Sequence, residues 1–410
     1  MRVAFVDLIF SWPPNGGADV DLYHVAQGLQ AVGHDVRVFV VHEADSYERG
    51  RVTPDALPFP TTRLDCSRRD LRPDRLCRRL AAAVDAWRPD VVFIQHGFAL
   101  KPYVCEALAH HRTVARYYAH ELTCARDARR FREGKPCPKD YLRTPDFCRA
   151  CALEGQRRAM CSWRLNTWNA DYLAARAYRP KYHARLLASL RTVDAVVVYN
   201  SMLKDDLTGF HYRVKVIPSG VRVADYEDLP PPRGLASDRA VILMSGRAED
   251  PLKGLDVLLE AGRRLREHRR DFEVRATHCD PAVSADWFTA LGWSDHAEAL
   301  RLYAAADMVV VPSLWAEPFG IVAVEAMAAG KPVCAGRIGG LRDIVRDGET
   351  GFLFEPGDAT ALARCIERLL DDAPLRERLG AEARRVARDY DWDRIIERHY
   401  LPLLEELVRA

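Results

Sequence analysis

Short continuous apolar runs and longer segments with helical spacing alternate along the first forty positions of the chain. The runs RVAFVDL and DVRVFVV enclose the segment VDLYHVAQGLQAVG, in which apolar residues recur at intervals of three and four. Short apolar runs bounded by turn residues predict strands, and the spacing between them predicts a helix. These residues therefore predict one strand–helix–strand unit of a parallel sheet.

The same pattern continues along the chain in two series. The first adds the predicted strands DVVFIQH (90–96), TVARYYAH (113–120) and AVVVYNS (195–201), and the second has AVILMSG, FEVRATH and MVVVPS, alternating with helices such as GLDVLLEAGRRLREH. Strands that are apolar throughout and alternate with helices indicate sheets covered on both faces. The predicted fold class is α/β, with two Rossmann-like, doubly wound halves whose strand carboxyl ends face a cleft.

Domain boundaries follow from where the two series begin and end. We expect an N-terminal domain over 1–210, a C-terminal domain over 211–390 and a closing amphipathic helix over 391–410 that packs back across them. The proline-rich stretch DLPPPRG at 228–234 follows the first boundary.

Composition and charge argue against nucleic-acid binding and against insertion into a membrane. With 60 basic and 58 acidic residues the formal charge is +2, which gives no general reason to expect nucleic acid as a partner. The first ten residues carry no long apolar segment before a cleavage site, and no stretch reaches the roughly eighteen apolar residues of a membrane span. We therefore expect a cytoplasmic protein without an integral membrane segment.

Two carboxylates stand in and beside an apolar run, AEPFGIVAVEAMAAGKPV at 316–333. Glu325 lies among Ile, Val, Ala and Met residues that predict a buried helix, and Glu317 precedes Pro318, which suits a first helical turn. A buried carboxylate needs partners, because leaving it unpaired costs several kcal/mol, by order of magnitude. Either Glu325 binds a vicinal diol of a ligand, or it pairs with an arginine of the core while Glu317 caps the helix.

The start of that predicted helix offers backbone donors. The amides of Phe319, Gly320 and Ile321 would be unpaired there and could bind a phosphate or orient hydroxyl oxygens. Arg247 and Lys253, in GRAEDPLKG directly after the strand AVILMS, place two cations at a strand's carboxyl end. Such a pair can neutralise a diphosphate, although a solvated basic loop is the simpler interpretation.

The first half of the chain has fewer candidate residues. Gly16 and Gly17 lie between the first strand and its helix, where glycine lets backbone amides approach a phosphate, or simply forms a turn. The pattern G-x-G-x-x-G of dinucleotide-binding proteins is missing. His120 ends the predicted strand TVARYYAH, where it could bond a sugar hydroxyl or a phosphate, or be structural.

Together these segments resemble the retaining glycosyltransferases of family 4, which have the two-domain GT-B fold. The resemblance rests on the Gly16–Gly17 loop, His120, VIPSGV, GRAEDPLKG, the Glu-x7-Glu run and GGLRDIVRDGETGFLFEPGD. It implies that Glu325 binds the ribose of a nucleotide sugar and that Glu317 contacts the donor sugar.

The resemblance also assigns the cationic and backbone groups. Arg247 and Lys253 would bind the diphosphate, and the amides of Gly16, Phe319, Gly320 and Ile321 would assist, while His120 would contact the donor sugar from the other domain. The departing diphosphate would itself accept the acceptor's proton, so that retention needs neither a protein nucleophile nor a catalytic metal.

The expected function is therefore transfer of a sugar, from a UDP-sugar by default, to the hydroxyl of a small-molecule or glycan acceptor. Natural-product glycosylation and cell-surface glycan assembly are both expected contexts. A nucleotide-sugar epimerase or a phosphorylase of the same fold is the nearest alternative. A zinc-containing protein that binds nucleic acid is a further one, which the near-zero charge disfavours.

Five cysteines crowd into one stretch of the first domain, within an expected insertion at about 121–165. Cys148 and Cys151 have the two-residue spacing of a zinc-binding pair, and Cys124 and Cys137 complete four ligands, with Cys161 as an alternate. A structural zinc is expected, because a polar, arginine-rich insertion has little apolar surface to order it. Reduced cysteines, disulfides and an iron–sulfur cluster are the alternatives.

Overall fold

The computed structural model describes residues 1–43, 49–53, 56–67, 69–162, 166–227, 235, 237–280 and 285–409. The chain divides into two compact units. Unit 1 comprises 1–130, 137–218 and 395–410, and unit 2 comprises 131–136 and 219–394. The division thus falls after residue 218, where 210 was expected, and residues 395–410 belong to unit 1. The proline-rich stretch 228–234 lies outside the described residues.

Unit 1 is built on a seven-stranded parallel sheet with the strand order β3-β2-β1-β4-β5-β8-β9. The central strand β1 aligns Val3 with Val36 of β2 and Val91 of β4. The sequences of most of these strands are almost continuously apolar because helices cover both faces of the sheet. Their bounds are β1 (Arg2–Asp7), β2 (Asp35–Glu43), β3 (Thr61–Cys66), β4 (Val91–Ile94), β5 (Thr113–Arg116), β8 (Ala195–Val198) and β9 (Val214–Val216).

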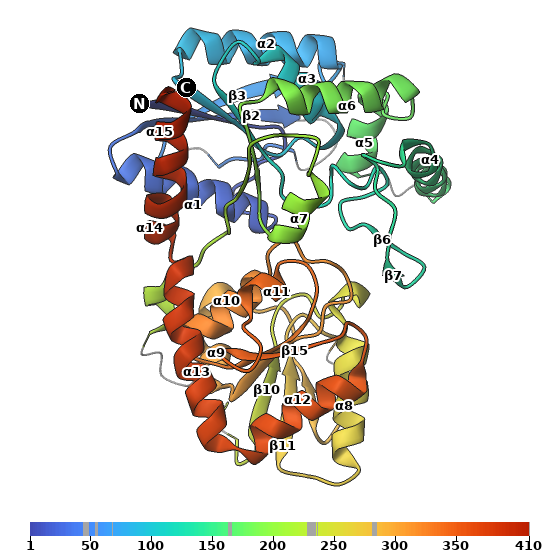
Figure 1. The fold of residues 1–410 in the computed structure, drawn as a ribbon, viewed down its shortest axis with the longest axis vertical. Coiled ribbons are helices and arrows are strands. Elements are labelled where there is room, and N and C mark those ends of the chain that lie inside the picture. Colours follow the sequence, from blue (N-terminus) through green and yellow to red (C-terminus); the bar gives the residue numbers. More distant parts are fainter. Residues whose placement is uncertain are drawn as a thin grey trace. The chain divides into compact units, whose positions relative to one another are not determined.

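Helices form a layer on each face of this sheet (Figure 1). α2 (Pro73–Trp87), α3 (Lys101–Ala107) and α6 (Pro180–Thr192) share one core with the side chains of Ala4 and Val6. α1 (Gly17–Ala31) lies on the other face with a π-helical turn, η5 (Ile396–Tyr400), and α15 (Leu401–Arg409). The remaining helices are η1 (Phe98–Leu100), α4 (Pro145–Cys161), α5 (Thr167–Ala174) and α7 (Ser201–Asp206).

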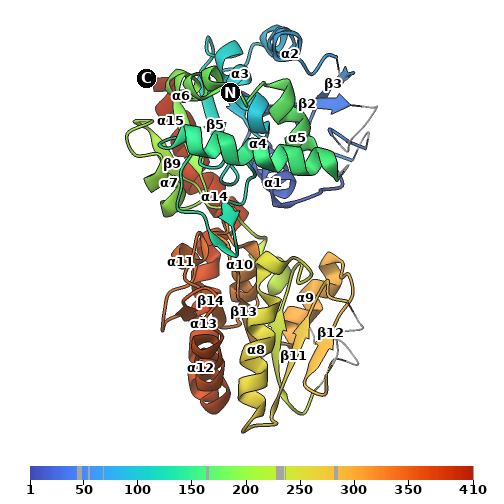
Figure 2. The same cartoon turned by 90° about the vertical axis from the view of Figure 1, so that its right-hand side faces the viewer.

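Unit 2 contains a six-stranded parallel sheet with the order β12-β11-β10-β13-β14-β15. α12 (Ala359–Asp371) packs beside α8 (Leu255–Arg266), and α10 (Ile321–Ala328) packs beside α13 (Ala373–Ala387) (Figure 2). The strands are β10 (Ala240–Met244), β11 (Phe272–Ala276), β12 (Phe288–Ala290), β13 (Met308–Val311), β14 (Val333–Gly336) and β15 (Gly351–Phe354), and a separate hairpin pairs β6 (Phe131–Arg132) with β7 (Lys135–Pro136).

The helical elements of unit 2 precede, connect or follow these strands. They are η2 (Val223–Tyr226), η3 (Pro251–Lys253), α8 (Leu255–Arg266), α9 (His296–Ala305), α10 (Ile321–Ala328), α11 (Leu341–Ile344), α12 (Ala359–Asp371), α13 (Ala373–Ala387), η4 (Arg388–Tyr390) and α14 (Trp392–Ile395). Each unit is thus a Rossmann-like, doubly wound domain, and the predicted fold class is confirmed. Among the described helices, none combines the length and the apolar composition that crossing a membrane requires.

Candidate active site

Glu325 is held by two tyrosines of unit 2. The Tyr303 hydroxyl of α9 donates to Glu325 Oε2 at 2.8 Å, and the Tyr226 hydroxyl of η2 also hydrogen-bonds to this carboxylate. Burial raises the pKa of Glu325, and the two hydroxyls and the nearby His296 only partly offset this effect. The residue is partly exposed rather than fully buried. The carboxylate is therefore bound by neutral hydroxyls, and the alternative of a core arginine is wrong.

Glu317 is nearly buried, 7% exposed, and bonds to a cation. Lys253 Nζ lies 2.9 Å from Glu317 Oε1, which also accepts a hydrogen bond from the Ser313 hydroxyl. Two loops, one after β10 and one after β13, thus meet through one ion pair. The predicted helix start at Pro318 is wrong, because α10 begins at Ile321 and Glu317 lies before it. The sheet brings Lys253 and Glu317 together because β10 and β13 are adjacent and parallel.

A tight turn at Gly254 positions Lys253. Lys253 ends η3, and the next residue, Gly254, has φ +83°. A Cβ atom at Gly254 would lie 2.1 Å from the carbonyl oxygen of Pro312, so only glycine fits this approach.

Arg247 projects from the same edge of the sheet, three residues after β10. Its side chain is exposed, and no carboxylate among the described residues pairs with it. The loop beneath it is fixed by Thr277 Oγ1, which accepts from the Gly246 amide at 2.8 Å and donates to the Gly246 carbonyl at 2.9 Å. The Arg247 guanidinium is therefore available to an anion from solution.

The backbone at the start of α10 is fixed by a second tight turn. Gly320, the N-cap residue, has φ +105°, and no side chain caps the helix there. The Gly340 amide donates to the Glu317 carbonyl at 2.7 Å, which anchors the preceding loop. Phe319 is buried and Ile321 is partly exposed. The predicted amide donors thus lie in a rigid loop next to Glu317.

In unit 1, Gly16 and Gly17 form the start of α1. Gly16 is the N-cap residue in extended conformation, both glycines are exposed, and a Cβ atom on either would meet nothing within 4 Å. Asp19 folds the loop by accepting from the amides of Ser11 at 3.2 Å and Asn15 at 2.8 Å. Neither glycine is therefore required by packing, which leaves room for a ligand.

His120 is buried, 1% exposed, four residues beyond the end of β5. The predicted strand therefore extends too far. The imidazole Nδ1 lies 3.4 Å from Thr123 Oγ1, and the His120 carbonyl accepts from the amides of Thr123 and Cys124. Whether His120 contacts a donor sugar stays a prediction.

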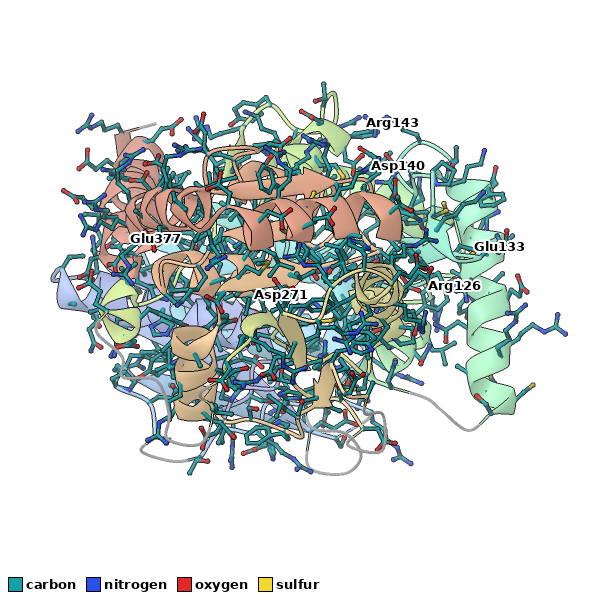
Figure 3. The ribbon with its side chains drawn as sticks, turned by 90° about the horizontal axis from the view of Figure 1, so that it is seen from below. Arg126, Glu133, Asp140, Arg143, Asp271 and Glu377 are labelled. Atoms are coloured by element: carbon teal, nitrogen blue, oxygen red, sulfur yellow. The ribbon has the colours of Figure 1, made fainter. Side chains whose placement is uncertain are left out.

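Four of the cysteines predicted to bind zinc lie near one another in the cysteine-rich segment. The thiols of Cys124, Cys137 and Cys151 each interact electrostatically with Cys148, whose pKa is raised by burial. Across the described ranges of the chain, however, no three of these thiols come within 4.8 Å of one another. The segment is held by ion pairs such as Arg143 with Asp140, which lie side by side in Figure 3. The geometry thus does not present a formed zinc site.

Sequence patterns missed a group of side chains at the carboxyl edge of β4. The His96 ring lies 4.9 Å from that of Phe98, which lies 4.7 Å from that of Trp168, and Phe98 has φ +38°. All three are partly exposed. Burial lowers the pKa of His96 to about 4, so its ring is neutral. The position of His96 just past a strand was the available signal. Trp168 belongs to the tryptophan-bearing stretch SWRLNTWNADY, which the sequence offers as a candidate acceptor segment, but no local pattern pairs it with His96 or Phe98.

Known proteins resemble both halves of the chain. The family described as Glycosyltransferase Family 4 matches residues 15–225, just over half of the chain, and the one described as Glycosyl transferases group 1 matches 285–386. The structure of Anabaena HepE in complex with UDP superposes with a TM-score of 0.67 at 17% identity, over 99% of this chain and 100% of that one.

Curated relatives match part of the chain. The phosphatidyl-myo-inositol mannosyltransferase of Mycobacterium leprae is 37% identical over 186 residues, which are 43% of this chain and 49% of that protein. The D-inositol 3-phosphate glycosyltransferase of Salinispora tropica is 33% identical over 257 residues, 53% of each. The chain thus spans about half the length of the curated relatives it matches. The fold, the Glu-x7-Glu loop and these matches together confirm the resemblance seen in the sequence: the chain belongs to Glycosyltransferase Family 4.

Proposed function

We propose that this protein is a retaining glycosyltransferase that moves a sugar from a nucleotide-sugar donor to an acceptor hydroxyl. The observation that carries the proposal is the edge of the unit 2 sheet, where Lys253 bonds to Glu317 and Arg247 has no carboxylate partner within the described part of the chain. Glu325 follows at the fifth position of α10. Cations and carboxylates of this kind suit a ligand that joins a diphosphate to vicinal hydroxyls.

Each group has a proposed role in binding the donor. Arg247 and Lys253 neutralise the diphosphate, and Glu325 accepts hydrogen bonds from the ribose. Glu317 contacts hydroxyls of the transferred sugar, and its ion pair with Lys253 fixes the position of its carboxylate. When the diphosphate departs, the charge that develops on it is stabilised by the same two cations and by the amides of Phe319, Gly320 and Ile321.

Retention follows if the acceptor attacks from the face that the diphosphate leaves. A leaving diphosphate oxygen then accepts the hydroxyl proton, so that neither a covalent intermediate nor a metal is needed for catalysis. The expected product keeps the donor's anomeric configuration in the presence of EDTA. An inverted anomeric proton signal by NMR, or activity lost in EDTA and restored by magnesium, contradicts this mechanism.

UDP is the proposed nucleotide, in part because the similar HepE structure is a complex with UDP. A ligand raises the unfolding temperature in proportion to its saturation of the folded state. UDP-sugars are therefore expected to stabilise the protein more than GDP-, ADP- or TDP-sugars. Incubation of the stabilising donor with and without acceptors then separates transfer from epimerisation, which needs no acceptor, and from phosphorolysis, which needs phosphate.

The acceptor is proposed to contact the carboxyl edge of the unit 1 sheet. His96, Phe98 and Trp168 present partly exposed rings there, and the strained backbone of Phe98 is typical of a ligand-binding position. Curated relatives are named for inositol acceptors, so cyclitols and sugars of cell-surface glycans or natural products are the first compounds to test. Trp168→Ala is expected to raise the KM for the acceptor and to leave donor hydrolysis unchanged.

A structural zinc in the cysteine-rich segment remains a proposal. It is supported by the Cys148–Cys151 spacing and by the electrostatic contact of both Cys124 and Cys137 with Cys148. Metal analysis of protein purified without a chelator is expected to find near-stoichiometric zinc in this segment, so that the zinc content falls by about one ion per chain in Cys148→Ser/Cys151→Ser. Metal-free protein with five titratable thiols in this segment overturns the proposal.

A further inference from the structure

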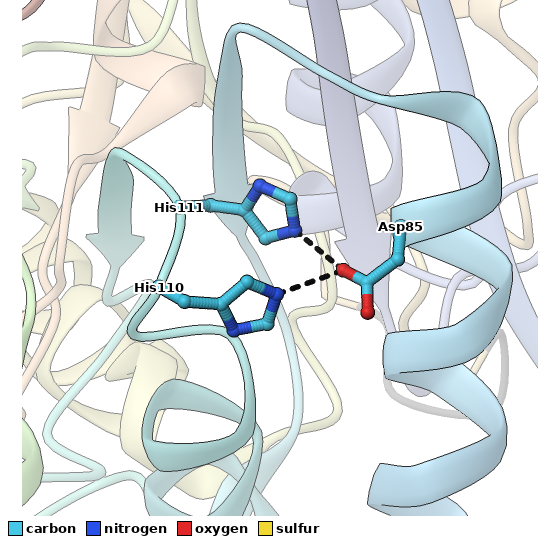
Figure 4. Close-up of side chains that lie close together, drawn as sticks. All are labelled: Asp85, His110 and His111. Carbon is cyan, nitrogen blue, oxygen red and sulfur yellow. Dashed lines mark hydrogen bonds and ion pairs between the residues drawn. The ribbon is translucent and has the colours of Figure 1, made fainter.

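One cluster of metal-ligating side chains lies away from every residue discussed so far. Asp85, in the last turn of α2, faces His110 and His111, which lie in the turn between α3 and β5 (Figure 4). His110 Nε2 is 2.8 Å and His111 Nε2 is 2.7 Å from the same carboxylate oxygen, Asp85 Oδ1. Among the described residues, this is the group of three whose ligand atoms all lie within 4.8 Å of one another.

The turn itself makes the two neighbouring imidazoles converge. The His111 amide donates to the Leu108 carbonyl at 2.9 Å, and the two rings lie 4.2 Å apart, centroid to centroid. Adjacent residues on a strand would point to opposite faces. The tight turn instead aims both Nε2 atoms at one oxygen.

We propose that Asp85, His110 and His111 bind a divalent first-row transition ion such as zinc. Two imidazoles and one carboxylate are a ligand set for such ions, and water can fill the remaining positions. Ligand atoms around an ion at about 2.1 Å are separated by roughly 3.0–3.4 Å. The observed separations of 2.7 and 2.8 Å are a few tenths shorter, so that small side-chain movements admit the ion.

The location indicates what the ion does. Both segments precede strands, since β4 follows α2 and β5 follows the histidine turn, so the site lies at the amino edge of the sheet. The candidate active-site residues lie at carboxyl ends. Side-chain exposure of 46% for Asp85, 55% for His110 and 14% for His111 leaves the site open to ions from solution. The ion cross-links α2 to the turn before β5 and stabilises unit 1 without entering the chemistry.

Calorimetric titration of chelator-treated protein with Zn²⁺ tests the proposal. A matched control is available in His268, an exposed imidazole whose Nε2 lies 2.7 Å from Glu367 Oε1 but whose sequence neighbours, Glu267 and Arg269, include no second histidine. His110→Ala/His111→Ala is expected to lower the bound stoichiometry by one, or to weaken this site at least tenfold, and to reduce the Zn²⁺-induced rise in unfolding temperature. Asp85→Asn is expected to weaken binding in the same way, and His268→Ala is expected to leave it unchanged.

Cobalt separates this site from the cysteines. Co²⁺ held by imidazole and carboxylate absorbs weakly in the visible range, whereas thiolate ligands add an intense near-ultraviolet band. The weak visible signal is expected to disappear in the double-histidine variant. Equal stoichiometry and affinity in wild type and double variant, or the absence of a non-thiolate ion in the wild type, overturns the proposal.

Discussion

At the scale of single residues, the proposed donor site depends on the Lys253–Glu317 pair and the exposed Arg247. Lys253→Ala is expected to reduce donor turnover roughly a hundredfold or more, because it removes a cation that faces developing charge on the leaving group. Initial rates with the identified donor measure this loss. Arg378→Ala, an exposed arginine of unit 2 on α13, is the control and should retain wild-type turnover. Wild-type rates in the Lys253 variant would falsify the assignment.

Glu325 connects activity to stability through its raised pKa. Between the ordinary value of 4.5 and the raised value, the folded chain holds a proton that the unfolded chain has released. The stabilising contribution is therefore complete below the ordinary value and is lost as the pH rises through the folded-state pKa. Glu325→Gln is thus expected to raise the free energy of unfolding at neutral pH relative to wild type.

The same substitution is expected to weaken donor binding roughly 10- to 100-fold, since it removes the charged acceptor that we propose for the ribose hydroxyls. Wild-type donor affinity is expected to fall as the pH drops below the raised pKa, and the variant's weaker affinity should be less sensitive to pH there. Urea unfolding and donor titration at several pH values measure the two effects. A variant that is both less stable and fully active contradicts this account.

At the scale of elements, most strands and helices were predictable from periodicity, and their ends were not. The apolar runs that became β1, β10 and β13 were found because burial on both faces leaves a continuous signal. Pro318 suggested a helix start, but α10 begins after Gly320, which has φ +105° and where a Cβ atom would lie 2.6 Å from the Leu341 side chain. The roles of Tyr226 and Tyr303 likewise depend on tertiary packing, and no local pattern points from either residue to Glu325.

The turn at Gly254 provides an element-scale test. Gly254→Ala forces a side chain into a left-handed residue against the Pro312 carbonyl, so a destabilisation of about 1–3 kcal/mol is expected. Donor turnover should fall with it, because Lys253 is the adjacent residue. Gly292→Ala, where a Cβ atom meets nothing within 4 Å, is the matched control for urea unfolding. Equal stability of the two variants would show that the loop relaxes without cost.

At the scale of the whole molecule, the sequence predicted two doubly wound domains and an amphipathic end, but not which domain the end joins. Residues 395–410 belong to unit 1, where Ile395, Ile396, Tyr400, Leu403, Leu404 and Leu407 are buried. Packing against α1 is close: a Cβ atom on Gly28 would lie 2.6 Å from the Ile396 side chain. In the sequence, neither Gly28 of α1 nor the apolar stripe of residues 395–410 shows that these two segments pack against each other.

Deletion of residues 395–410 is therefore expected to unfold unit 1 and to leave unit 2 folded. Six buried apolar side chains contribute on the order of 10 kcal/mol, comparable with the entire stability of a domain, about 5–15 kcal/mol. Limited proteolysis followed by mass spectrometry should release an intact fragment of unit 2. Val408→Ala, at a position 42% exposed, is the control and should resist proteolysis as the wild type does. A protease-resistant unit 1 in the deletion variant contradicts the expectation.

The return of these residues to unit 1 also affects how the chain folds during synthesis. Domains usually fold in the order in which the ribosome makes them, but here unit 1 includes residues 395–410, which follow unit 2 in the sequence. All of unit 2 leaves the ribosome before residues 395–410, so unit 2 can complete its fold first, while the face of α1 that those residues cover stays exposed in the nascent chain. During that interval the nascent chain presents a binding surface for chaperones, and unit 1 can be finished only after all of unit 2 has been synthesised.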